Sequence, residues 1–394
     1  MKKYIILIAA VLMMLFVGIH LAWSTFVPVL KQNYGFSVAQ TQTVFGTAIL
    51  VLTCFMFVGS QLEARIGPRF TSFIGGIIYG TSYILAGYSD GSYTSLLVFI
   101  GICSAIASGL CYMSSLSCAT KWFPQHRSIV IGIVVAGFGC SAIFVSRLGE
   151  YLLAQQVDVL TIFKYLGICS LIIITIASLF LQNPPVGKST ITGQSHMKIR
   201  TILRDRNFWG LFCGFFPGSC VGLMCIGNIK PFGLSLDLSS VVAGAAVTVV
   251  ALFNTLGRIG WGLIGSLIDG KKTILISLIS TSIVCLAAPL AITGSISFQI
   301  FAILAGFNYA SCMVLYAAEI ARIYGAERMG RIYSILIVFN GLAGFIAPPF
   351  AGKIFDTMGT YTPAFLIFGS LSLISIFLFH FIYQPDRIDK LKRL

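Results

Sequence analysis

The sequence predicts an all-α integral membrane protein with twelve transmembrane helices in two six-helix pseudo-symmetric halves. Three observations predict this class: the composition, a series of apolar runs, and an internal duplication about a polar connection. Of the 394 residues, 57% are hydrophobic and 10% are charged, and the mean hydropathy is +0.94. Soluble proteins are roughly a quarter charged, so the composition excludes a soluble fold.

Twelve apolar runs, bounded by charged, proline or turn residues, are long enough to cross a bilayer. A hydrocarbon core of ~30 Å needs about 20 apolar residues per helix. The first run begins Met-Lys-Lys and could pass for a secretory signal, but no Ala-x-Ala pattern follows it. We therefore interpret all of them as transmembrane helices, at residues 4–27, 38–62, 70–88, 94–118, 128–152, 160–181, 208–228, 240–266, 273–292, 296–320, 331–352 and 362–382.

The basic residues predict how the array is oriented. Most of the 26 lysines and arginines fall in the segments on one side, which begin with Lys2 and Lys3 and end with Arg387 to Arg393. Because cytoplasmic loops retain positive charge, both termini are expected in the cytoplasm, with the chain crossing the cytoplasmic (inner) membrane many times. The net charge of +14 then matches anionic lipid headgroups and requires no nucleic acid.

A polar connection after the sixth run divides the chain into an N-terminal half (1–182), a cytoplasmic linker (183–206) and a C-terminal half (207–394). Two halves of the same kind are indicated by matches 201 residues apart: Lys121 with Arg322, and Phe138 with Phe339. Parallel six-helix repeats are one layout of secondary transporters, whose substrate site lies between the halves near the bilayer midplane.

Arg258 is the most informative single residue, since it lies inside the eighth apolar run. An arginine at this depth costs about 2.5–3.5 kcal/mol on insertion scales, so it should face a cavity or a partner. Either it forms the positive end of a site for a small anion, or it is paired inside the bundle and holds helices together. Asn254, one turn earlier on the same face, could bind the same ligand or orient Arg258.

Four stretches carry a resemblance to a known family. In chain order they are Lys121-Trp122-Phe123-Pro124, Leu203-Arg204-Asp205-Arg206, Asn254-x-x-Gly257-Arg258-x-x-Trp261, and Ala351-Gly352-Lys353-Ile354-Phe355-Asp356 with Gly359-x-Tyr361. The architecture resembles the major facilitator superfamily, and these motifs resemble its oxalate/formate antiporter and monocarboxylate transporter branches. The resemblance implies a secondary active transporter of a small organic anion.

Departures from the family pattern narrow the expected substrate. Oxalate carriers of the family have a second cation in the eleventh span, where this sequence has Asn340. Animal monocarboxylate carriers have an aspartate one turn before the arginine, where this sequence has Asn254, which cannot take up a proton. A single cation favours a monocarboxylate over a dianion, and the missing aspartate favours exchange over proton symport. The resemblance also implies that the loop containing Glu63 locks the halves together.

Other polar residues in the spans are weaker candidates for substrate binding. Tyr112 resembles an aromatic residue that lines the family's site, although it could equally be a packing residue. His20 could be the protonatable group, or it could be a core histidine satisfied by a backbone carbonyl. Asn308 and Tyr309 could each contact a ligand or form an interhelical hydrogen bond. Arg147 is expected near the outer face, either snorkelling to the interface or paired with Glu150, and not as a ligand.

No enzymatic chemistry is expected. The glycines near Phe138 imitate a dinucleotide fingerprint but lie within an apolar run. No Cys-x-x-Cys or metal-ligand spacing occurs, so no cofactor or metal is predicted.

Two alternatives to an organic-anion transporter stay open: a proton-coupled carrier of a neutral solute or drug, and a non-transporting membrane sensor. A monomer in contact with membrane lipids is expected. Pro348 and Pro349 should break or kink the eleventh helix.

Overall fold

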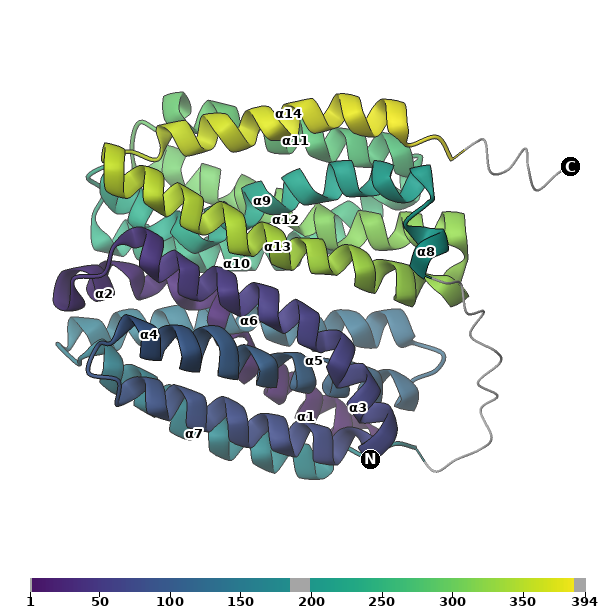
Figure 1. Ribbon diagram of the computed structural model, residues 1–394, viewed down its shortest axis with the longest axis horizontal. Coiled ribbons are helices and arrows are strands. Elements are labelled where there is room, and N and C mark those ends of the chain that lie inside the picture. Colours follow the sequence, from purple (N-terminus) through teal and green to yellow (C-terminus); the bar gives the residue numbers. More distant parts are fainter. Residues whose placement is uncertain (1, 185–198, 386–394) are drawn as a thin grey trace, which may run out of the picture.

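The computed structural model describes residues 2–184 and 199–385, and helices are its only regular secondary structure. The helices form two bundles stacked against each other (Figure 1). Helices α1 to α7 make the N-terminal half and α9 to α14 the C-terminal half. Part of the predicted linker, residues 185–198, lies outside the described residues.

The N-terminal half matches the predicted runs closely. Its elements are α1 Lys2–Val17, the 3-10 helix Gly18–Thr25, α2 Val27–Tyr34, α3 Val38–Gly87, α4 Tyr93–Leu96, the π-helix Leu97–Cys103, α5 Ser104–Trp122, α6 Arg127–Ala154 and α7 Val159–Phe180. The 50 residues of α3 cover two predicted runs, because the helix bends at Gly67, where φ is 84°. A positive φ suits glycine, which has no Cβ.

The C-terminal half repeats the pattern. Its elements are α8 Ile199–Ile202, α9 Arg206–Ser235, α10 Ser240–Leu267, α11 Gly270–Ala291, α12 Ser295–Tyr324, α13 Ala326–Met358 and α14 Thr362–Ile382. In the described residues, 11 helical stretches are long and apolar enough to span a membrane. Because the bent α3 crosses twice, the twelve predicted transmembrane helices are confirmed.

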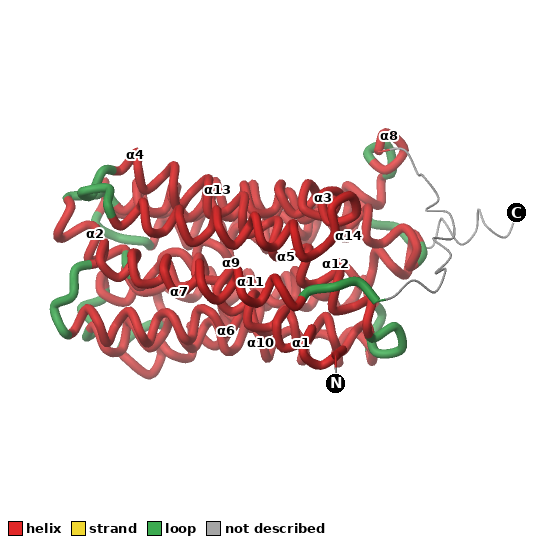
Figure 2. Tube along the Cα trace, turned by 90° about the horizontal axis from the view of Figure 1, so that it is seen from below, coloured by secondary structure: helices red, strands yellow, loops and turns green. Residues whose placement is uncertain are grey.

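The bundle has two ends, which we name after short helices that lie at them. The α2 end carries α2 and α4, and the α8 end carries α8 (Figures 1 and 2). Because α3 begins directly after α2 and crosses twice, its bend at Gly67 falls at the α8 end. Large apolar side chains such as Ile8, Ile259 and Phe381 cover the outside between these ends, each at least 60% exposed. In water such a surface would aggregate, so the protein is a multi-pass membrane protein.

The two halves meet along two helix pairs, α3 with α13 and α6 with α10. Glycines allow the backbones of α3 and α13 to touch: a Cβ atom on Gly46 would lie 2.4 Å from the carbonyl oxygen of Gly344. Near the α2 end, a Cβ on Gly352 would lie 2.9 Å from the amide nitrogen of Ala39. This seam therefore depends on the absence of side chains.

Helix α13 is not broken at its two prolines, because it continues through Pro348 and Pro349 to Met358. The predicted break is therefore wrong, and the kink that the sequence offers in its place stays a prediction. Asn228 of α9 ties this part of α13 to its neighbours, since it donates to the carbonyl of Pro348 at 3.4 Å and accepts from the hydroxyl of Tyr361 at 3.3 Å.

Candidate substrate site between the halves

The residues that flank Arg258 fix the rotation of helix α10 about its own axis. A Cβ atom on Gly257 would lie 2.8 Å from the carbonyl oxygen of Phe307 on α12, so the two helices touch there. One turn later, the indole of Trp261 donates a hydrogen bond to the same carbonyl at 3.0 Å. The motif Asn254-x-x-Gly257-Arg258-x-x-Trp261 thus fixes the direction in which α10 presents its arginine.

Arg258 lies between the halves and is only partly buried. The hydroxyls of Tyr112 on α5, Tyr309 on α12 and Tyr333 on α13 lie within electrostatic range of its guanidinium, so aromatic groups from both halves are near it. The ion pairs between described residues join Lys121 with Glu63, Lys230 with Glu150 and Arg322 with Glu319, and none of them involves Arg258. No described residue hydrogen-bonds the guanidinium either, so its charge remains available to a ligand.

Two of the predicted amides lie in this neighbourhood. Asn254 is 5% exposed, one turn from Arg258, and its side-chain oxygen has no partner in the part of the chain that the structure describes. Asn340 is 6% exposed and accepts a hydrogen bond from the hydroxyl of Tyr309 at 3.2 Å. Tyr112 also belongs here, packed edge-to-face on Phe138. The structure therefore gathers Arg258, Asn254, Tyr112 and Asn340 at one place.

His20 and Asn308 lie elsewhere. His20 is buried in the N-terminal half, where its Nε2 is 2.9 Å from the hydroxyl of Ser104 and its ring packs edge-to-face on Tyr79 and Tyr83. This arrangement favours the core-histidine interpretation, with a hydroxyl in place of the expected carbonyl. Asn308 lines a small, mostly apolar cavity inside the C-terminal half, beside Cys225 and Thr281.

Tyr333 was missed by the reasoning from sequence. A signal existed for this residue, because it precedes Asn340 by seven residues, which places both on one face of α13 after two turns. Tyr309 is a polar residue that the sequence predicts for a ligand or for an interhelical hydrogen bond. The structure gives it such a bond, to Asn340 of α13.

The halves are closed at the α2 end. The carboxylate of Asp356 on α13 accepts hydrogen bonds from the backbone amides of Val38 and Ala39, at 3.0 and 2.8 Å. Lys230 on α9 pairs with Glu150 on α6 and also donates to the carbonyl of Thr25. Further bonds join Gln42 to the carbonyl of Gly227 at 2.6 Å and Ser146 to Thr248 at 3.1 Å. Every hydrogen bond between described residues of the two halves lies toward this end.

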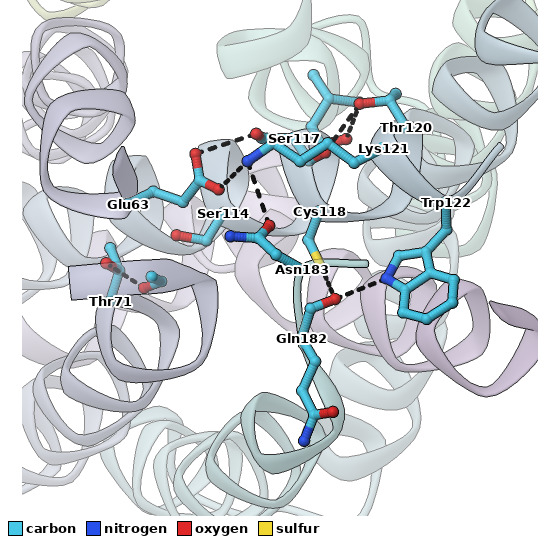
Figure 3. Close-up of polar contacts among 12 residues, drawn as sticks. Glu63, Thr71, Ser114, Ser117, Cys118, Thr120, Lys121, Trp122, Gln182 and Asn183 are labelled. Atoms are coloured by element: carbon cyan, nitrogen blue, oxygen red, sulfur yellow. Dashed lines mark hydrogen bonds and ion pairs between the residues drawn. The ribbon is translucent and has the colours of Figure 1, made fainter. Parts of the chain in front are cut away.

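At the α8 end the polar networks stay within each half. Lys121 contacts Glu63 at 2.6 Å, and Ser117 donates to the other carboxylate oxygen at 3.0 Å (Figure 3). Lys121 also donates to Asn183, and Trp122 donates to the carbonyl of Gln182 at 2.6 Å. All these partners belong to the N-terminal half. The expectation that Glu63 locks the two halves together is therefore wrong for this conformation.

Two six-helix bundles that enclose a free cation and meet at one end define the class of secondary transporters. The family follows from the sequence itself. The model of the Major Facilitator Superfamily matches residues 6–239 and 219–393, so the chain belongs to this family. It is a transporter and not an enzyme.

Several relatives in this family are named after small organic anions. The chain is 25% identical over 386 residues to the oxalate:formate antiporter of Oxalobacter formigenes, covering 97% of this chain and 91% of that protein. It is 24% identical to monocarboxylate transporter 13 of Rattus norvegicus, covering 80% of this chain and 73% of that one. A solved bacterial homologue of the lysosomal transporter Spinster, inward-facing and unoccupied, shares the fold with a TM-score of 0.76 at 16% identity, covering 98% of this chain and 97% of that one.

Proposed function

We propose that this protein moves a small monocarboxylate across the cytoplasmic membrane by alternating access. The observation that carries the proposal is the Arg258 guanidinium, which lies between the halves among three tyrosines and meets no carboxylate of a described residue. A free guanidinium offers two parallel hydrogen bonds to a carboxylate and stays charged at any working pH.

The relatives support an anionic substrate of this size. Besides the oxalate:formate antiporter and monocarboxylate transporter 13, the apicoplast pyruvate carrier 1 of Toxoplasma gondii is 21% identical over 364 residues, covering 72% of this chain and 64% of that protein. These names share a carboxylate as the transported group. A carrier of neutral solutes would have no use for a bare cation between its halves, which argues against the neutral-solute alternative.

The charge of the site favours a monoanion. Asn340, where the resemblance implies a second cation, is neutral and already accepts the hydroxyl of Tyr309 at 3.2 Å. One guanidinium in a partly dry cavity balances one negative charge, and a second carboxylate would be buried without a partner. We therefore place lactate, pyruvate and formate ahead of oxalate.

The closed α2 end supports alternating access. With both termini in the cytoplasm, the site would open to the cytoplasm in this conformation, and transport would require the bonds of Asp356 and Lys230 across the halves to break. Substrate binding neutralises Arg258 and so lowers the cost of burying it when the halves close at the α8 end. Since Asn254 cannot supply a proton, the substrate itself performs this step, which favours exchange.

The test is uptake into proteoliposomes by the wild type and by Arg258→Gln. We expect at least a hundredfold loss of pyruvate or lactate exchange, because the lost interaction is a bidentate charged pair. Arg65→Gln, at an exposed arginine of the α8 end, is the matched control and should transport normally. The melting temperature of the purified wild type should rise with monocarboxylates and not with phosphate, since a ligand bound only to the folded state stabilises it. Normal exchange by Arg258→Gln would refute the proposal.

A further inference from the structure

A groove of about 580 Å³ lies on the outside of the N-terminal half, between α1 and α6. It is lined by Leu15 of α1 and by Cys140, Phe144, Arg147, Leu148 and Tyr151 of α6. All the lining residues belong to one half, and none of them is part of the candidate substrate site.

The groove faces the bilayer. On α1, the preceding residues of the same stripe are Ile5, Ile8 and Leu12, which are 47%, 60% and 42% exposed. On α6, Phe144 and Tyr151 are 47% and 64% exposed. A helix face that is apolar and exposed in a membrane protein is covered by lipid. Arg147 is the charged residue on this face of α6.

Arg147 has no partner among the described residues. The alternative in which it pairs with Glu150 is wrong, because Glu150 forms its ion pair with Lys230, whose side chain is almost completely buried. No other described residue forms an ion pair or hydrogen bond with the Arg147 guanidinium. An unpaired arginine on a lipid-facing surface is unfavourable unless its charged group reaches a polar partner in the interface.

The groove has a polar end and an apolar end. Arg147 lies seven residues before the end of α6 at Ala154, which is about 10 Å along the helix and so close to the headgroup region at the α2 end. Tyr151, one turn closer to that end, is an aromatic residue of the kind found at headgroup level. Cys140 lies near the middle of α6, and Leu15 lies near the middle of the helical stretch Lys2–Thr25 that α1 begins, so both are at the depth of acyl chains.

We propose that this groove binds one phospholipid of the leaflet at the α2 end. The guanidinium of Arg147 holds the phosphate through its two-pronged donor geometry, and one acyl chain follows Phe144 and Cys140 toward the bilayer centre. The order of polar and apolar groups along the groove is the order within a phospholipid. A soluble anion would use the arginine and leave the apolar part of the groove empty.

The test uses native mass spectrometry of the full-length protein in detergent with added phosphatidylglycerol or with diacylglycerol of the same acyl chains. The wild type should retain one phosphatidylglycerol and bind diacylglycerol at least tenfold more weakly. Arg147→Gln should lower phosphatidylglycerol retention about tenfold, since it removes a charge-assisted contact. Arg147→Lys should lose less, because a positive charge remains. Arg65→Gln is the control and should match the wild type.

A second variant keeps the proposal testable if Arg147→Gln misfolds. Cys140→Trp should fill the apolar part of the groove and also reduce retention, although Arg147 is still present. Equal retention of phosphatidylglycerol by the wild type and Arg147→Gln would overturn the proposal. So would equal binding of diacylglycerol and phosphatidylglycerol, or displacement of the lipid by inorganic phosphate at millimolar concentration.

Discussion

At the scale of single residues, the environment of Arg258 determines which anions fit. The guanidinium is supplied by α10, the hydroxyls by α5, α12 and α13, and the neutral amides by Asn254 and Asn340. The charge of the site is therefore a property of very few side chains. Two substitutions test this directly, one that adds a cation and one that adds an acid.

Asn340→Lys should change the preferred substrate from a monoanion to a dianion. A second cation balances a second carboxylate, so oxalate exchange should rise and formate or pyruvate exchange should fall, with the ratio shifting by tenfold or more. The measurement is exchange of each labelled acid in proteoliposomes. Asn340→Gln keeps the site neutral and is the control. An unchanged ratio in the lysine variant would show that position 340 does not face the substrate.

Asn254→Asp should inhibit transport wherever the new aspartate is charged. The carboxylate pairs with Arg258 one turn away and competes with the substrate, so exchange should drop about tenfold. The same pairing lowers the pKa of the aspartate below its usual value of about 4, so the loss should persist as the pH falls from 8 to 5. Initial rates over this pH range measure the effect, with Asn254→Ser as a control that cannot titrate. Recovery of exchange within this range would contradict the predicted pairing.

At the scale of elements, two acids near helix C-termini hold the α2 end closed. Asp356 lies in the last turn of α13, where the helix dipole disfavours a carboxylate. The carboxylate is nevertheless stabilised there by the other half of the molecule. It accepts hydrogen bonds from the amides of Val38 and Ala39 and so caps the N-terminus of α3. Glu150 lies near the end of α6, the pseudo-symmetric counterpart of α13, and reaches Lys230. Gly244 leaves room for it, since a Cβ there would lie 2.7 Å from the carboxylate.

Lys230→Met should favour opening at the α2 end. It removes the partner of a half-buried carboxylate, which weakens the closed state by about 1–3 kcal/mol. Labelling of cysteines introduced near the α2 end should then be faster than in the wild type. The exchanged pair, Lys230→Glu with Glu150→Lys, should restore slow labelling. If the single variant labels at the wild-type rate, the pair does not contribute to closure.

At the scale of the whole molecule, transport requires the two halves to separate at the α2 end and meet at the α8 end. The contact between α6 and α10 is close enough for a covalent test, because the side-chain oxygens of Ser146 and Thr248 lie 3.1 Å apart across the halves. We expect a disulfide between Ser146→Cys and Thr248→Cys, in a background with the 11 native cysteines replaced, to abolish exchange.

Reduction of that disulfide should restore exchange, and the oxidised protein should still bind substrate from the α8 side in a thermal-shift measurement. Each single cysteine variant is a control. Exchange that continues at the normal rate after complete cross-linking would mean that the halves do not rock apart at this contact.

The sequence by itself determined the crossing segments and the duplication, and it singled out Arg258 as a charge within one of those segments. Lipid cannot satisfy backbone polar groups, so each crossing must be a continuous apolar helix that is visible in local composition. A charge in such a helix is conspicuous for the same reason. The turn at Gly67 was also recognised, as the polar gap between two runs, although the structure joins them into one bent helix.

Tertiary structure decided which side chains meet. Glu150 had Arg147 three residues away, yet it pairs with Lys230, which is 80 residues distant in the chain. Tyr309 and Tyr333 come near Arg258 only because α12 packs on α10 and α13 packs on α12, while His20 turns into the core of its own half. Charge pairing depends on distances of a few ångströms between helices. Hydropathy along the chain determines which segments become helices of the bundle. Only the packing of those helices determines which of their faces touch.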